Sequence, residues 1–82
     1  MATVTTKQAP DFISRCVAIA SEMLKLHAQH MWLDYDEEAD VLYISFRKPQ
    51  RATTTIETDD GILIRKDGKK IVGLTILNAS SR

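Results

Sequence analysis

The spacing of apolar residues changes once along this 82-residue chain, near His30, from a helical period to alternation in twos. Between Asp11 and Gln29, apolar residues recur at steps of three and four, which places them on one broad stripe of a helix. After His30, short runs of alternating apolar and polar residues are separated by turn residues, as in strands with one buried face. The pattern predicts an α+β fold, with one amphipathic helix packed on a small antiparallel sheet.

The helix is expected over about residues 10–29. Pro10 suits a first turn, where its missing N–H is not needed, and Asp11 places a carboxylate near the positive end of the helix dipole. We expect the apolar stripe to cover one face of the sheet. Its members are Phe12, Ile13, Cys16, Val17, Ile19, Ala20, Met23, Leu24 and Leu26.

The sheet is expected over about residues 31–78, as a meander of four or five strands in which each strand pairs with the next. Asp59-Asp60-Gly61 and Asp67-Gly68 predict tight hairpin turns, because Asp-Gly tolerates the positive φ that such turns need. Residues 10–82 are predicted to form a single α+β domain, since a chain of this length suits one domain. Residues 1–9 are predicted to be a flexible segment.

A chain this short can hide only about three-fifths of its extended surface, so its core is thin. Cys16 is the single cysteine, which excludes a disulfide within the chain. The helix is apolar over a wide arc, and the second face of the sheet also retains apolar residues. We therefore expect a homodimer, with a second subunit covering what one chain leaves exposed. The residues predicted to take part are Phe12, Ile19, Met23, Leu26 and Tyr43.

Eleven basic and eleven acidic residues cancel. This balance argues against a strongly basic nucleic-acid binder and against a polybasic membrane-binding surface. We expect no membrane span, and the first residues lack the basic and apolar sequence of a secretory signal, so a cytoplasmic location is expected.

Charged turns are predicted to separate to opposite ends of the sheet, because successive turns of antiparallel strands alternate in direction. The acidic set comprises Asp34, Asp36, Glu37, Glu38 and Asp40. The basic set comprises Arg47, Lys48, Arg51, Arg65, Lys66, Lys69 and Lys70. Two interpretations remain open: charged turns keep a small sheet soluble, or the two ends contact partners of opposite charge, with nucleic acid or an acidic protein at the basic end.

Neither the acidic set nor the histidines predict a metal site. The acidic spacing lacks the glycine that a twelve-residue calcium loop requires, and favours a turn in which Asp36 accepts backbone hydrogen bonds. His27 and His30 are interpreted as stabilising the expected helix C-terminus through its dipole, rather than as ligands. Cys16 is interpreted as a buried packing thiol.

Catalytic motifs are missing from the sequence. The three glycines are isolated, so no phosphate-binding loop is present, and no serine lies in a nucleophile elbow. We therefore expect a protein that is not an enzyme and uses no cofactor.

Three segments resemble the small bacterial and archaeal family known as domain of unknown function 2283. They are Tyr35-Asp-Glu-Glu-Ala-Asp-Val-Leu-Tyr-Ile44, Asp60-Gly-Ile-Leu-Ile64 and Ile71-Val-Gly-Leu-Thr-Ile-Leu-Asn-Ala-Ser80. The resemblance spans about residues 33–80 and leaves out the helix, while Asn78 stands where the family more often has aspartate. It implies a small β-rich domain without an established activity. Some members lie beside toxin-like genes, which implies an antitoxin-like role.

Three functions follow as hypotheses. The first is a non-enzymatic interaction module that self-associates and binds a protein partner. The second is a nucleic-acid-binding regulator that uses the basic end of a dimer. The third is a small-ligand binder at a subunit interface.

Overall fold

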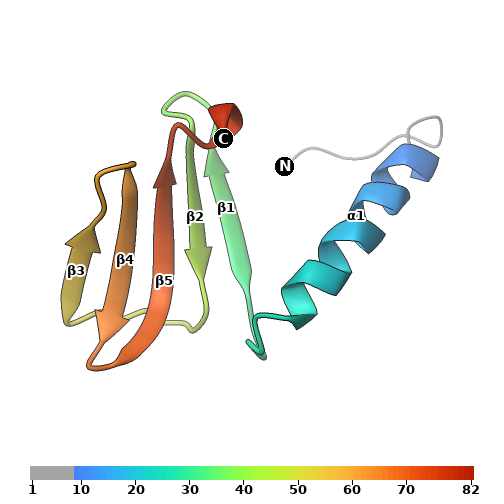
Figure 1. The fold of residues 1–82 in the computed structure, drawn as a ribbon. Helices are drawn as coiled ribbons and strands as arrows, with labels where there is room; N and C mark the ends of the chain where they lie inside the picture. The colour runs from blue at the N-terminus through green and yellow to red at the C-terminus, as the bar shows by residue number, and fades with distance from the viewer. Residues whose placement is uncertain (1–8) are drawn as a thin grey trace.

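A computed structural model describes residues 9–82 as one helix beside a five-stranded antiparallel sheet (Figure 1). This architecture confirms the predicted α+β class. Of the segment predicted to be flexible, residues 1–8 lie outside the described residues and Ala9 is helical. The elements are α1 (Ala9–Leu24), β1 (Trp32–Asp36), β2 (Val41–Ser45), β3 (Thr54–Glu57), β4 (Ile62–Asp67), β5 (Lys70–Leu77) and the short 3-10 helix η1 (Ala79–Ser81).

Helix α1 ends at Leu24, five residues before the predicted end. The N–H groups of the next three residues bond to the carbonyls three positions earlier, at 3.0–3.2 Å, which is a tighter turn than that of an α-helix. His27 then adopts a left-handed backbone with φ 55°, a conformation that commonly ends helices. The apolar spacing continues through Leu26, but these local backbone bonds end the helix first. His27 and His30 therefore lie beyond the helix, and their interpretation as residues of its C-terminal turn is wrong.

The strand order is β1-β2-β5-β4-β3, so the predicted meander is wrong in its order although every neighbouring pair is antiparallel as predicted. Strands β3, β4 and β5 follow one another through tight turns, and β2 lies beside β5, which makes β2–β5 a Greek key. The segment between β2 and β3 passes the lower end of the sheet in Figure 1. Strand β5 has eight residues, mostly apolar, and takes the middle of the sheet, whereas the four-residue β3 takes an edge. Central pairing satisfies backbone groups on both sides of the longest strand.

The register of the strands separates the side chains into two faces. We call one the apolar face, because aliphatic residues from all five strands form a row across it: Leu33, Ile44, Leu74, Ile64 and Ile56. A second row on this face contains Tyr35, Leu42, Ile76 and Ile62. The other side, the polar face, carries the row Asp34, Tyr43, Thr75, Leu63 and Glu57. Directly opposed residues in neighbouring strands share a face, which is why the register fixes both sets.

Helix α1 covers neither face. It leaves the sheet beyond the lower end of β1 and points away from it (Figure 1). From Pro10 to Leu24 its residues are exposed except Met23, which is half-buried. The prediction that α1 packs on the sheet is therefore wrong for the single chain, as is the prediction that Cys16 is buried, because the turn at His27 directs the helix outward. Among the described residues only Val41 and Val72 are buried apolar residues.

Gly73, in the middle of β5, lets the β2–β3 segment close onto the polar face. The Gln50 amide donates to the Ser45 hydroxyl at 2.8 Å and accepts a hydrogen bond from Arg65. A Cβ at position 73 would collide with the Gln50 amide and would lie 2.9 Å from the Ile44 carbonyl oxygen. A larger residue there would push Gln50 off the sheet.

Gly73→Ala is expected to destabilise the protein by about 1–3 kcal/mol, the usual cost of overpacking. The Ile44 carbonyl belongs to the central ladder and has little room to move. Urea unfolding at one fixed protein concentration measures the effect, with Thr75→Ala, the next residue on the same side of β5, as control. In a Gly73→Ala/Gln50→Ala double variant part of the loss should be recovered. Equal unfolding midpoints for wild type and Gly73→Ala would contradict the close approach.

Candidate functional site

The apolar face is the most extensive candidate binding surface on the sheet. At its margins Leu33 is 50% exposed and Ile56 is 46% exposed. The central residues Ile44 and Leu74 are only half-buried. Monomeric soluble proteins rarely expose an apolar patch that continues across a whole sheet. This exposure is typical of a surface that another element or molecule covers.

The apolar stripe of α1 is exposed in the same way. Phe12 is 49% exposed, Val17 65% and Leu24 77%. The opposite side of α1 carries two ion pairs, Arg15–Asp11 at 3.1 Å and Lys25–Glu22 at 3.0 Å, with Lys25 directly after the helix end. Exposed pairs of this spacing suit a side that faces water. The chain thus carries two separate apolar surfaces, one on the helix and one on the sheet.

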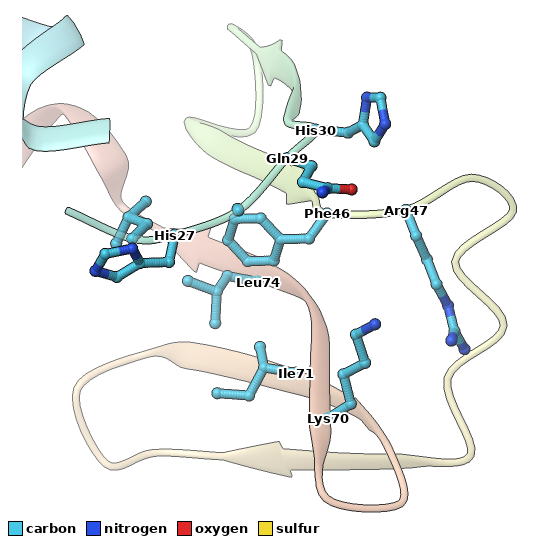
Figure 2. Close-up of a pocket in the computed structure, with 10 residues that line it drawn as sticks. His27, Gln29, His30, Phe46, Arg47, Lys70, Ile71 and Leu74 are labelled. Carbon is cyan, nitrogen blue, oxygen red and sulfur yellow. The ribbon is translucent and has the colours of Figure 1, made fainter. Parts of the chain in front are cut away.

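A groove of about 700 Å³ opens at the lower end of the apolar face, where the connection after α1 runs over the sheet (Figure 2). Its floor is apolar, and Leu26 lines it from the connection. Basic and polar side chains stand at its rim. The floor residues are Phe46, Ile71 and Leu74, and the rim includes His27, Gln29, His30, Arg47 and Lys70. The groove is continuous with the apolar face, because Leu74 belongs to both.

The two histidines of the groove do not converge. They point in opposite directions from the connection in Figure 2, and His30 stacks on Trp32 with ring centroids 5.6 Å apart. Within residues 9–82, no three His, Cys, Asp or Glu side chains gather as metal ligands.

The basic residues lie at one end of the sheet, as the strand directions predict. The β2–β3 segment and the β4–β5 turn are joined there by an ion pair between Arg47 and Asp67, at 2.6 Å. Arg47 also donates to the Gln50 carbonyl at 3.1 Å, and Arg65 donates to the Gln50 side chain. The ammonium of Lys48 lies 5.7 Å from the centre of the Trp32 ring. Internal contacts therefore occupy three of the seven predicted basic residues, while Arg51, Lys69 and Lys70 are exposed.

The acidic set occupies the β1–β2 turn and its flanks at the opposite end. Asp36 accepts the Ala39 N–H at 3.2 Å, which confirms the turn interpretation for this residue. Asp40 accepts hydrogen bonds from the Tyr35 hydroxyl at 2.6 Å, from the Ser80 N–H at 3.0 Å and from the Ser80 hydroxyl at 2.7 Å. We call Tyr35, Asp40 and Ser80 the Asp40 cluster. Its hydrogen bonds hold the C-terminal turn against the β1–β2 hairpin.

Hydrogen bonding shifts the acid–base equilibria of the Asp40 cluster. The Tyr35 hydroxyl, followed by Ser80, holds the pKa of Asp40 below its usual value. The same bond raises the pKa of Tyr35, because ionised tyrosine could not donate to a carboxylate. At the β3–β4 turn, a hydrogen bond from the Thr58 hydroxyl lowers the pKa of Asp60, with a smaller effect of Arg82. The arrangement stabilises ionised carboxylates at turns.

The structure does not bring together all the residues predicted for self-association. Phe12 and Ile19 lie exposed on α1, where Met23 is half-buried, and Leu26 lines the groove. Tyr43 lies on the polar face. The five-strand apolar row was missed because the helix was expected to cover it. The Asp40 cluster was missed because its members are separated by up to 45 positions in sequence, although all three belong to the segments that carry the family resemblance.

A family described as protein of unknown function (DUF2283) matches residues 32–80, which is more than half of the chain. The match begins at β1, includes all five strands and leaves out α1. No curated protein and no solved structure matches the chain. In the described residues no helix is long and apolar enough to cross a membrane.

Asp40→Asn is expected to lower the melting temperature at neutral pH, and the difference from wild type should shrink as the pH falls below about 4. A carboxyl group whose pKa is lowered by folding contributes stability above its ordinary pKa. That contribution is lost as the pH falls through the lowered value. Asparagine keeps the shape and tolerates the left-handed backbone at position 40, where φ is 55°.

Thermal melting followed by circular dichroism from pH 7 to pH 3 measures this effect. Glu38→Gln, which removes a carboxylate from the same exposed turn, is the control and should change the melting curve little. A difference between wild type and Asp40→Asn that stays constant over this pH range would contradict the assigned role.

Proposed function

We propose that this chain, which belongs to the DUF2283 family of proteins of unknown function, is a non-enzymatic interaction module that self-associates and binds a protein partner. One observation carries the proposal: the apolar row of the sheet spans all five strands, and its central residues are only half-buried in the described chain. A second molecule that covers this row would remove aliphatic surface from water, which is the main driving force of association.

The surface area of the single chain supports self-association. The chain exposes 6803 Å², whereas a compact monomer of this length exposes about 4,900 Å². Even if about 1,300 Å² is subtracted for residues 1–8, the other 74 residues expose about 5,500 Å². A compact monomer of 74 residues exposes about 4,600 Å², so the excess is about 900 Å². Two chains that buried this excess would form an interface of about 1,800 Å², a size typical of stable complexes.

The groove at the lower end of the apolar face supports the same role. Its apolar floor joins the central row through Leu74, and it is open to solvent along that side (Figure 2). A protein segment that lies across the sheet would therefore also reach the groove. The antitoxin-like form of the role rests on the family resemblance alone.

Leu33→Lys and Ile56→Lys are expected to weaken the dimer about tenfold or more in dissociation constant, because each would place an ammonium group in a buried interface. Both residues are about half exposed in the single chain, so a monomer would tolerate lysine there. Tyr43→Lys is the matched control, since Tyr43 is 43% exposed but lies on the polar face. It should change the dissociation constant less than about threefold.

Light scattering coupled to size-exclusion chromatography, over a dilution series and at low and high salt, measures the mass of each variant. Circular dichroism checks that all variants are folded. A wild-type protein that is monomeric at high micromolar concentration would contradict self-association. Equal weakening by all three substitutions would contradict the assignment to the apolar face.

Binding of a protein partner is tested separately from self-association. Where a toxin-like reading frame lies beside the gene, co-expression of the two proteins should give a complex that is purified intact. Growth inhibition by the neighbouring protein that this chain does not relieve would contradict the antitoxin-like form.

A further inference from the structure

We propose that the apolar face is covered by helix α1 of a second copy of this chain, so that two chains exchange helices. The inference rests on the self-association proposed above and identifies what binds to the sheet. In the described part of the chain, α1 is the apolar element outside the sheet, and its stripe is exposed along its length.

The dimensions of helix and sheet agree. Sixteen residues of α1 make a helix about 24 Å long, at 1.5 Å per residue. The five strands span four interstrand spacings, or about 19 Å. One helix laid across the strands therefore reaches every member of the row from Leu33 on β1 to Ile56 on β3.

The side chains of α1 are arranged to lie flat on a sheet. At about 100° per residue, its stripe covers about 160° of the circumference. The small residues Cys16 and Ala20 lie near the middle of the stripe. Larger side chains flank them, with Phe12, Ile19 and Met23 on one side and Ile13, Val17 and Leu24 on the other. Small residues at the centre allow the helix axis to come close to the branched side chains of the row, while the flanking residues reach the same strands above and below the row.

The connection after α1 favours exchange over packing on the chain's own sheet. Leu26 lines the groove together with Phe46 and Leu74, so the connection already occupies the lower end of its own apolar face. The left-handed backbone of His27 then directs α1 away from that face (Figure 1). Packing α1 on its own sheet would require this turn to reverse, whereas a second copy receives α1 in the orientation that it already has. Exchange of one element between identical chains is a common route to a dimer.

Disulfide trapping in the full-length chain tests the exchange, because Cys16 is the single native cysteine and lies near the middle of the stripe. One further cysteine is introduced at a time into the central part of the row, as Ile44→Cys, Ile64→Cys or Leu74→Cys. The matched controls are Tyr43→Cys and Thr75→Cys, the neighbours of Ile44 and Leu74 on the polar face. Each protein is oxidised by air with copper phenanthroline, which leaves no glutathione bound to a thiol, and is separated on a non-reducing gel. Remaining thiols are counted with a maleimide reagent.

At least one apolar-face variant is expected to give a covalent dimer without free thiols, because exchange forms two disulfides between the chains. The controls should cross-link at least about tenfold less under the same conditions. A covalent monomer without free thiols would overturn the exchange, since α1 would then cover its own sheet. Covalent dimers formed equally by the unmodified chain would also overturn it, because they would show Cys16 facing the Cys16 of the other copy.

The outcomes separate this inference from the proposed function. If wild type is a dimer that Leu33→Lys weakens, but none of the apolar-face cysteines cross-links to Cys16, self-association stands and the exchange fails. If wild type is a monomer by light scattering, both fail.

Discussion

The position of β5 between β2 and β4 determines most of the remaining structure. It gives the longest strand hydrogen-bonding partners on both sides, and it aligns aliphatic residues of all five strands on one face. The same order carries the β2–β3 segment across the end of the sheet, where Gln50 closes over Gly73. It also delivers the chain after β5 to the first hairpin, where Ser80 meets Asp40. The aliphatic row, the crossover between β2 and β3 and the contact of Ser80 with Asp40 thus all follow from the central position of β5.

Local sequence signals predicted the elements well. Alternation located the strands, and both Asp-Gly turns formed with left-handed glycines, at φ 83° for Gly61 and 63° for Gly68. The two charged ends separated as the strand directions required, because β2 and β3, although not neighbours, lie three positions apart in the sheet and still run in opposite directions. The predicted strand order was wrong. Turn residues indicate which strands follow one another in sequence, but they do not indicate which strand is stabilised most by hydrogen-bonding partners on both sides.

For helix α1, the sequence predicted the apolar stripe but not what the stripe packs against. Its period and apolar stripe were read correctly, but its end and its packing were not, because both depend on the turn at His27. Nothing in the residues around this position marks it as left-handed, and helical spacing continues through Leu26. An amphipathic stripe indicates that one side of a helix is suited to burial, but it does not indicate whether the same chain or another molecule buries it. The candidate surfaces were therefore predicted only in part. The residues of α1 and Tyr43 were expected to take part in self-association, whereas the row across the five strands was expected to lie under the chain's own helix.

Trp32 stands where the connection after α1 becomes β1, stacked on His30 and approached by the Lys48 ammonium. It is the single tryptophan of the chain, so all of the protein's indole emission originates at this junction. An imidazole against the ring and a cation above it are groups that alter the emission of an indole. The junction between helix and sheet therefore contains its own optical probe, which reports its geometry in solution without any added label.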